Sequence, residues 1–305
     1  MPERPLRLLF TGASGFLGSA VFEKVAHNPN WLSVALLRSA SMVIKHDRVQ
    51  QVRVRDLSDA GEIKAALGSF VPDRIVHAAA LSSPIACERN HHEADQSNRL
   101  ITFTLCDLAQ QWHAPITFIS TDLVFDGATV PAGGFTESDR PSPLSAYARS
   151  KVVGEQRVLE LQQLGAVVRL SLVFGKSPSD SPGVLGWMKQ ALENRQTLTL
   201  FDDEFRTPIF IDDACDIILA IAASSAKGVW HAGGRERLSR VEFGHLFCAS
   251  MGYDSNLILS ASRESSPSDV KRPEDVSLNS KKFLTEFGFG PRPVAEALKH
   301  LAPLL

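Results

Sequence analysis

The sequence predicts an α/β fold built on a doubly wound parallel sheet, followed by a smaller region of mixed structure. Three observations predict it. Short apolar runs alternate with segments of helical periodicity through residues 6–174. A glycine-rich turn joins the first apolar run to the first helical segment. The alternation ends after Gly175, where a loop rich in serine and proline begins.

Buried strands are expected where an apolar run is too short for a helix and is bounded by turn residues. These runs cover residues 6–12, 31–38, 49–57, 73–80, 115–122 and 166–175. Helices are expected where apolar side chains recur at three- and four-residue spacing, which covers residues 15–27, 59–69, 92–112 and 143–164. Strands that alternate with helices imply right-handed crossovers and a parallel sheet with both faces covered.

The composition is that of an ordinary globular protein. The chain has 305 residues, of which 44% are hydrophobic and 22% charged, and its formal net charge is −2. This balance gives no reason to expect nucleic acid or a membrane surface as a partner. The apolar runs are far shorter than the roughly 20 residues that span a bilayer. The first residues do not resemble a signal peptide, and the four cysteines form no CxxC pair, so we expect a cytoplasmic protein with free thiols.

The string TGASGFLG places three glycines between the first strand and the first helix. A tight turn needs unusual backbone angles, and a phosphate approaches the backbone closely only where no Cβ intervenes. The N–H groups and the dipole at a helix start also favour an anion. A plain packing turn is the alternative, but the strand–turn–helix context favours a dinucleotide. The expected contacts are Gly12, Ser14, Gly15, Phe16, Leu17 and Gly18.

The GxxGxxG spacing resembles the cofactor turn of the short-chain dehydrogenase/reductase superfamily, which implies a Rossmann-type domain that binds NAD(P). The second strand ends at Arg38 and Ser39, where NAD binders usually place a carboxylate. A cation suits the 2′-phosphate, so NADP(H) is the preferred cofactor and NAD(H) remains possible. The alternative for Arg38 is a solvated charge at a strand end.

Two further segments resemble cofactor contacts of that superfamily. Asp56 and Leu57 follow the third strand and match a pair that lies near the adenine there. The fourth strand is followed by Ala78, Ala79 and Ala80. Their small side chains would let the cofactor lie against the edge of the sheet.

Tyr147 and Lys151 lie four residues apart in the last expected helix, and such residues share a helix face. A free tyrosine has a pKa of about 10. A nearby ammonium lowers it and would prepare the phenol for proton transfer. Ser120 and Thr121 end the fifth strand, where ligands bind in such folds and where a hydroxyl can hold a substrate carbonyl. The alternative is an amphipathic surface turn with a half-buried tyrosine and a solvated lysine.

With these motifs the chain resembles the extended short-chain dehydrogenases, and more narrowly their dTDP-4-dehydrorhamnose reductase-like branch. The strings that carry the resemblance are TGASGFLG, IVHAAAL, ISTDLVFDG, TESDRPSPLSAYARSKVVGE, VVRLSLVFG and KRPEDVSLNSKK. The resemblance implies hydride transfer from NADPH to the C4 keto group of a nucleotide-linked sugar. It also implies catalytic roles for Thr121, Tyr147 and Lys151, with Ser120 as neighbour and Asn98 completing the site.

Two positions depart from that branch. Leu123 stands where the reductases usually have tyrosine, and Leu172 where they usually have tryptophan. Both are expected to face the sugar, which predicts a different or more apolar pocket. Arg206 is expected either to bind the substrate diphosphate or to pair with an acidic residue among 202–204.

We interpret residues 1–174 as the NAD(P)-binding domain, with a return segment near 205–231, and residues 175–305 as mainly substrate-binding. A homodimer is possible. We expect no metal, since Asp212 and Asp213 suit a helix start and residues 90–95 make a poor chelate.

Two other functions stay open. One is an NAD-dependent sugar-nucleotide epimerase of the same fold. The other is a non-catalytic NADP-binding regulatory subunit that resembles the methionine adenosyltransferase beta subunit. A dehydratase is disfavoured, because Asp122 follows Thr121 without an adjacent glutamate. His77 is expected to be a satisfied core group, and Arg272 either binds a ligand phosphate or braces the second region.

Overall fold

The computed structural model describes residues 4–38, 46–179, 181–265 and 270–304. At its centre lies a parallel sheet of seven strands in the order β11-β6-β5-β4-β1-β2-β3. This sheet confirms the predicted doubly wound α/β fold. The strands are β1 (Leu6–Thr11), β2 (Trp31–Leu37), β3 (Val49–Arg53), β4 (Arg74–His77), β5 (Ile116–Thr121), β6 (Gly165–Leu170) and β11 (Gly228–Ala232).

The carboxyl ends of the strands do not lie level. Thr11 ends β1 opposite His77, which ends β4 and pairs with Phe118 of β5. β5 then continues to Thr121, which pairs with Leu170 at the end of β6. At about 3.3 Å per residue, three further residues carry β5 and β6 roughly 10 Å beyond β1 and β4. The edge of the sheet therefore has a step.

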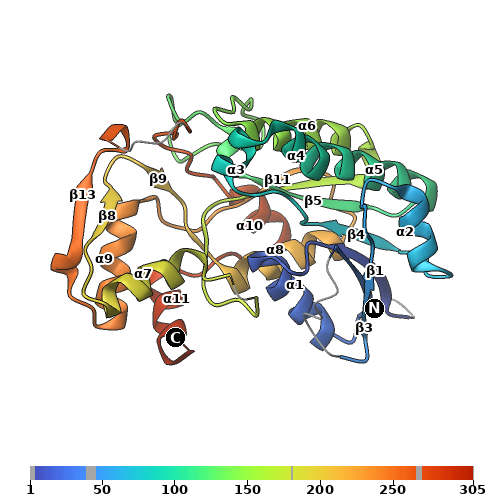
Figure 1. Ribbon diagram of the computed structural model, residues 1–305, viewed down its shortest axis with the longest axis horizontal. Coiled ribbons are helices and arrows are strands. Elements are labelled where there is room, and N and C mark those ends of the chain that lie inside the picture. Colours follow the sequence, from blue (N-terminus) through green and yellow to red (C-terminus); the bar gives the residue numbers. More distant parts are fainter. Residues whose placement is uncertain (1–3, 39–45, 180, 266–269, 305) are drawn as a thin grey trace.

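Helices cover both faces of the sheet (Figure 1). On one face, α1 (Phe16–His27) packs beside α8 (Ile211–Ala223). On the other face lie α2 (Ala60–Leu67), α5 (Ile101–Trp112) and α6 (Ala146–Leu159). Each face has its own apolar core, so both faces are buried as a parallel sheet requires.

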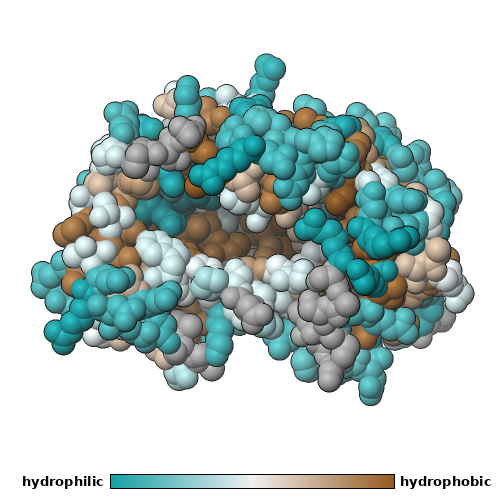
Figure 2. Space-filling model, in the orientation of Figure 1, coloured by the Kyte–Doolittle hydropathy of each residue, from teal (hydrophilic) through white to brown (hydrophobic). Residues whose placement is uncertain are grey.

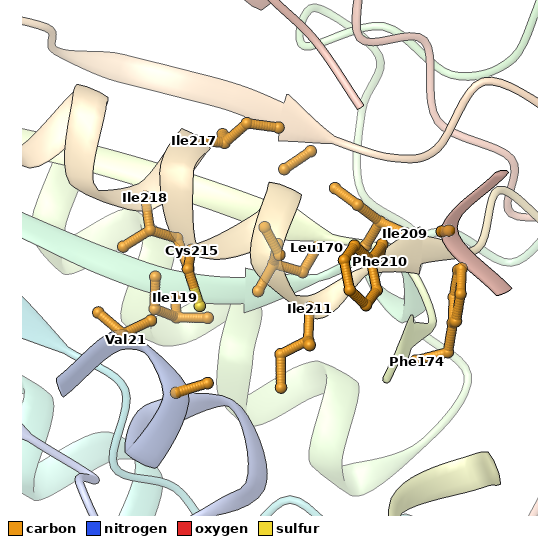
Figure 3. Close-up of a cluster of buried hydrophobic side chains, with 14 of the residues drawn as sticks. Val21, Ile119, Leu170, Phe174, Ile209, Phe210, Ile211, Cys215, Ile217 and Ile218 are labelled. Atoms are coloured by element: carbon orange, nitrogen blue, oxygen red, sulfur yellow. The ribbon is translucent and has the colours of Figure 1, made fainter. Parts of the chain in front are cut away.

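Figure 3 shows the core beneath α8, where side chains of the helix meet side chains of the sheet. Cys215 and Ile218 of α8 lie against Ile119 of β5, with Leu170 of β6 and Val21 of α1 nearby. Each of these side chains is less than a tenth exposed. Burying an aliphatic side chain of this size contributes about 1.5–3 kcal/mol. These contacts therefore hold α8 against β5 and β6.

A second group of elements lies on the left of Figure 1, beside the sheet. In it β8 (Leu198–Phe201) pairs in parallel with β13 (Ile258–Ala261), and α9 (Arg240–Met251) packs on both strands. The other α-helices of the described residues are α3 (Pro84–Arg89), α4 (His91–Ala94), α7 (Gly183–Glu193), α10 (Lys281–Phe287) and α11 (Val294–Leu301). Four short strands form two further pairs, β7 (Val173–Phe174) with β10 (Ile209–Phe210) and β9 (Phe205–Arg206) with β12 (Leu238–Ser239).

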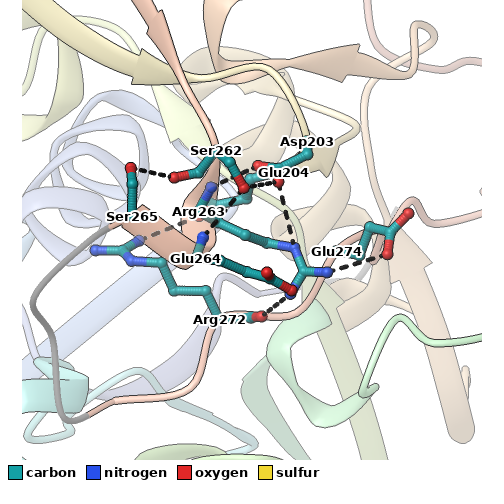
Figure 4. Close-up of polar contacts among 8 residues, drawn as sticks. All are labelled: Asp203, Glu204, Ser262, Arg263, Glu264, Ser265, Arg272 and Glu274. Atoms are coloured by element: carbon teal, nitrogen blue, oxygen red, sulfur yellow. Dashed lines mark hydrogen bonds and ion pairs between the residues drawn. The ribbon is translucent and has the colours of Figure 1, made fainter.

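Ion pairs and hydrogen bonds connect the loops of this second group (Figure 4). Arg263 Nη2 lies 3.1 Å from a Glu274 carboxylate oxygen, and its backbone N–H donates to Asp203 at 2.7 Å. Arg272 Nη1 donates to Glu204 at 3.1 Å, while the Arg272 carbonyl accepts from Arg263 at 3.2 Å. Of the two roles considered for Arg272, these contacts support the structural one.

Two expected elements are divided in the structure. The expected helix 92–112 consists of α4, a π-helical stretch (Asp95–Leu100) and α5. The expected strand 166–175 ends at Leu170, and β7 pairs with β10 outside the main sheet. The expected helix 143–164 is shorter, because the Ser145 side chain accepts from the Ala148 N–H at 3.2 Å and so starts α6.

Candidate active site

A cavity of about 870 Å³ opens at the step in the sheet edge. Figure 2 shows it as a hollow at the centre of this face, with hydrophobic residues on its floor. It lies where β1, β4, β5 and β6 end. The expected site residues that line it are Gly12, Ser14, Gly15, Phe16, Leu17, Gly18, Arg38, Leu57, Ala78, Ala79, Ala80, Ser120, Thr121, Leu123, Tyr147, Lys151, Leu172 and Arg206.

Among the described residues, two expected contacts are not part of the cavity lining. Asp56 accepts two hydrogen bonds from Ser58 and so holds the turn after β3. Asn98 exchanges hydrogen bonds with the backbone of Leu81 and donates to Ser150 at 2.9 Å. Ser39 lies outside the described residues. Asn98 therefore holds the segment after β4 in place and does not itself line the cavity.

Sequence reasoning missed several lining residues, most of them apolar. They carry no chemical motif, and for six of the eight the only signal that could have found them is their position at or just after the end of a strand. They are Leu36, Leu37, Ser82, Pro84, Ile119, Leu170, Ser171 and Val173.

The glycine turn packs too tightly for side chains at two of its three glycines. Gly12 has φ of +87°, and a Cβ there would lie 2.6 Å from the backbone of Ala78 and Ala79. A Cβ at Gly18 would lie 1.9 Å from the Gly12 carbonyl oxygen. At Gly15 a Cβ would meet only that oxygen, at 3.4 Å, so this glycine leaves open space at the start of α1. Such a bare helix start suits a phosphate.

Thr121 and Tyr147 come together on the opposite wall of the cavity. The Thr121 hydroxyl donates to Asp122 at 3.3 Å, and the Thr121 and Tyr147 side chains both line the cavity. Burial and the Asp122 carboxylate raise the pKa of Tyr147. We expected Lys151 to lower this pKa, but burial is the largest influence on the phenol and the net shift is upward. The phenol therefore keeps its proton in the protein as it stands.

Lys151 is buried one helical turn from Tyr147, and its side chain is not solvated. Its Nζ lies 3.9 Å from the centre of the Phe118 ring. Burial lowers the pKa of Lys151 to about 7, and the Glu155 carboxylate opposes this shift. His77 lies nearby, held between Thr11 at 2.8 Å and Thr102 at 3.0 Å. Burial lowers the pKa of His77 to about 3, so it is the neutral, satisfied core group expected.

Ser120 lines the cavity, but its hydroxyl does not face a substrate. It donates to the buried Glu155 carboxylate at 2.5 Å. We expected this hydroxyl to share the catalytic role of Thr121. The side chains of Ser120 and Thr121 instead point to different neighbours, because successive residues of a strand face opposite sides of the sheet.

Arg206 pairs with Asp122, an acidic residue outside the 202–204 segment considered from the sequence. Arg206 Nε donates to one Asp122 oxygen at 2.6 Å and Nη2 donates to the other. Asp122 is fully buried, and the Arg206 side chain is 11% exposed. Arg206 also lines the cavity. Its guanidinium therefore connects Asp122, just after β5, to the short strand β9.

Comparison with known proteins places the chain in a family. The model of the RmlD substrate binding domain matches residues 6–304. The chain belongs to this family. The resemblance to the dTDP-4-dehydrorhamnose reductase-like branch of the extended short-chain dehydrogenases is thereby confirmed.

Members of the RmlD family and related proteins match over nearly the whole chain. The probable low-salt glycan biosynthesis reductase Agl14 of Haloferax volcanii is 28% identical over 91% of both chains. The methionine adenosyltransferase 2 subunit beta of Rattus norvegicus is 30% identical over 96% of this chain and 85% of its own. A crystal structure of dTDP-4-dehydrorhamnose reductase from Bacillus anthracis in complex with NADP has a TM-score of 0.85 at 22% identity and covers 99% of this chain and 100% of its own.

The described residues lack two further kinds of feature. They contain no cluster of three or more histidine, cysteine, aspartate or glutamate residues placed to hold a metal ion. No helix among them is long and apolar enough to cross a membrane.

Replacing Arg206 with methionine should lower the free energy of unfolding by about 3–5 kcal/mol at about pH 7.5, because it leaves the Asp122 carboxylate buried without a partner. A lone buried carboxyl has a folded-state pKa above its unfolded value, so its destabilisation grows as pH rises. The loss should therefore shrink at about pH 5, where Asp122 takes up a proton. Urea unfolding at both pH values measures this.

The control is Arg4→Met, which removes an exposed guanidinium from Asp73 while Arg7 stays paired with it. It should leave the free energy of unfolding unchanged within experimental error at either pH, because exposed ion pairs contribute little. An equal loss at both pH values in the Arg206 variant would contradict the assignment of Asp122–Arg206 as a buried ion pair.

Proposed function

We propose that this protein is an NADP(H)-dependent reductase that transfers a hydride to the keto group of a nucleotide-linked sugar, with Tyr147 as the proton donor. One observation carries the proposal. A glycine turn suited to a dinucleotide phosphate lines the same cavity as the Thr121 hydroxyl and the Tyr147 phenol. Neither the glycine turn nor the two hydroxyl groups alone distinguish a catalyst from a binding protein, but together they support a cofactor site beside a proton donor.

The lining residues fit a nicotinamide dinucleotide. Gly12 and Gly15 bring bare backbone to the start of α1, where the diphosphate would lie. Ala78 and Ala79 offer a flat edge for the nicotinamide side. Arg38, exposed at the end of β2 and lining the cavity, suits a 2′-phosphate, which supports NADP(H) over NAD(H). When bound, the reduced cofactor supplies the hydride.

The protein's own residues would supply the proton and stabilise the developing charge. The raised pKa of Tyr147 keeps its phenol protonated, which suits a donor in the reducing direction. The hydroxyls of Thr121 and Tyr147 would both donate to the carbonyl oxygen, so fixed donors meet the negative charge that develops there. The Lys151 ammonium would approach the ribose and favour the phenolate left after proton transfer.

The sugar would lie between these hydroxyls and a largely apolar wall. Leu123 and Leu172 line the cavity and are partly buried. These two leucines are smaller than the tyrosine and tryptophan usual in the branch and have no polar group. They therefore suit a less polar sugar than the usual substrate of the branch. The Arg206 guanidinium would point towards the diphosphate of the substrate.

We also propose that residues 1–174 bind the cofactor and that residues 175–305 mainly bind the substrate.

A regulatory role is the second candidate, because a methionine adenosyltransferase subunit beta is among the relatives. A regulatory subunit would bind NADPH without turnover. An epimerase would retain bound NAD and consume no reductant. Screening purified protein for NADPH consumption with 4-keto nucleotide sugars distinguishes the three functions.

Replacing Tyr147 with phenylalanine should lower kcat at least about 100-fold, since the proton donor is removed. The Kd for NADPH should change less than about threefold, because the ring and Lys151 remain. Stopped-flow NADPH oxidation and fluorescence titration measure the two quantities. Tyr253→Phe is the matched control, since the other tyrosine of the chain lies outside the cavity lining and should leave both values unchanged. Equal turnover of the Tyr147 variant and the wild type would exclude the proton-donor role.

Replacing Arg38 with aspartate should shift the preference from NADPH towards NADH. Removing a charge-assisted contact of about 1.5–3 kcal/mol corresponds to about a 10- to 100-fold change in the ratio of the two Kd values. Titration with both cofactors measures the ratio. Arg53→Asp, at an exposed position outside the cavity lining, should leave it unchanged. Unaltered selectivity in the Arg38 variant would count against a 2′-phosphate contact.

A further inference from the structure

A chain of buried polar side chains runs behind the catalytic helix turn, on the side away from the cavity. Its centre is Glu155 of α6, which is 2% exposed and lies one helical turn after Lys151. Residues four apart on a helix share a face, so the carboxylate and the lysine side chain leave α6 on the same side. Glu155 is absent from the cavity lining, and the chemistry proposed above does not use it.

Arg169 fixes the orientation of this carboxylate. From β6 its Nε and Nη2 donate to the two Glu155 oxygens, at 3.0 Å and 2.7 Å. Arg169 is 3% exposed, and its Nη1 lies 3.4 Å from His231 Nε2. Burial lowers the pKa of His231 to about 3, so the ring is neutral, donates from Nδ1 to the Phe135 carbonyl at 3.0 Å and accepts from Arg169. Both ends of the carboxylate are thus held.

Ser120 completes the chain at the cavity edge. Its hydroxyl donates to Glu155 Oε1 at 2.5 Å, a short charge-assisted bond. This bond turns the hydroxyl proton away from the cavity, although the Ser120 backbone lies on the cavity wall. Thr121 lines the same cavity as Tyr147 and its hydroxyl donates to Asp122, so Thr121 is the residue of this pair whose hydroxyl stays beside the cavity.

We propose that Glu155 is a positioning residue of the reaction: held by Arg169, it draws the Ser120 hydroxyl away from the substrate and supplies the negative charge that keeps the Lys151 ammonium charged inside the protein. The inference deepens the proposed function, since it concerns the same lysine. It reassigns Ser120 from catalysis to positioning.

The surroundings of Lys151 leave few other sources of that charge. β5 presents the Phe118 ring, and β4 presents His77, which is neutral. On α6 itself Tyr147 is neutral and Glu155 is charged. Arg169 stands on β6 behind Glu155, and its charge is opposed by that carboxylate. Without Glu155, burial alone would act on Lys151 and favour the free amine.

The direct test is an NMR titration of the lysine ε-carbon in ¹³C-lysine-labelled protein, with the Lys151 signal assigned by its loss in Lys151→Arg. In Glu155→Gln, which keeps the shape and loses the charge, the midpoint should fall by about one pH unit or more. Ser120→Ala keeps the carboxylate, so its midpoint should stay within about 0.3 units of wild type. An unshifted midpoint in a folded Glu155→Gln protein overturns the proposal.

Glu155→Gln leaves Arg169 without a full partner and could prevent folding. The double variant Glu155→Gln/Arg169→Gln removes both charges. Because Glu155 acts on Lys151 from within the same helix face and Arg169 stands behind it, the midpoint should still fall, by a smaller amount. A midpoint equal to that of the wild type in this double variant likewise overturns the proposal.

Kinetics supply the second readout. The ammonium is present below its pKa, so the basic limb of kcat/KM against pH should move to lower pH in Glu155→Gln, while the rate on the acid side stays within about threefold of wild type. A uniform loss at every pH would indicate a purely structural role and overturn the proposal. Ser120→Ala should lose less turnover than Thr121→Ala, and an equal loss in the two variants would restore Ser120 to catalysis. Since the NMR titration needs no substrate, its outcome stands even if the protein proves not to be a reductase.

Discussion

The site depends on the uneven ends of four parallel strands. β1 and β4 stop at Thr11 and His77, whereas β5 and β6 run on to Thr121 and Leu170. Because of this step, the glycine turn forms the floor of the cavity, and the longer ends of β5 and β6 form one of its walls. A ligand on that floor lies below Thr121, and the tyrosine of α6 reaches the same point because α6 packs along β5 and β6. The register of the sheet thus brings residues from four separate segments to one cavity.

Two buried ion pairs lie close to the end of β5, and a contribution to stability does not explain them. Glu155–Arg169 and Asp122–Arg206 are both nearly free of solvent contact. Desolvation of such pairs often cancels their attraction, and apolar replacements can be as stable. Both pairs involve residues next to or between the proposed catalytic groups: Asp122 follows Thr121, and Glu155 bonds Ser120. Their common effect is to fix the direction of side chains at the end of β5, where a small misplacement of a hydroxyl would matter most.

The sequence predicted the features that depend on local pattern. Apolar runs and the TGASGFLG turn located the strands of the first half and the phosphate-binding corner, and helix spacing placed Tyr147 beside Lys151. Features that depend on tertiary contacts could not be predicted from the sequence. No local pattern shows that the Ser120 hydroxyl turns to Glu155, that Arg206 pairs with Asp122 across 84 residues of sequence, or that burial outweighs the lysine in setting the pKa of Tyr147. Asn98 was placed in the site by resemblance, yet its side chain holds the Leu81 backbone.

The central claim is that a carbonyl carbon is reduced between the glycine turn and Tyr147. Transfer of deuterium from NADPH in which both hydrogens at nicotinamide C4 are replaced by deuterium to a 4-keto nucleotide sugar tests it most directly. Mass spectrometry should find one deuterium in the product for each NADPH oxidised, and NMR should place it on the new carbinol carbon. Bound, unoxidised cofactor and an unlabelled sugar after prolonged incubation with each available 4-keto nucleotide sugar would contradict the account.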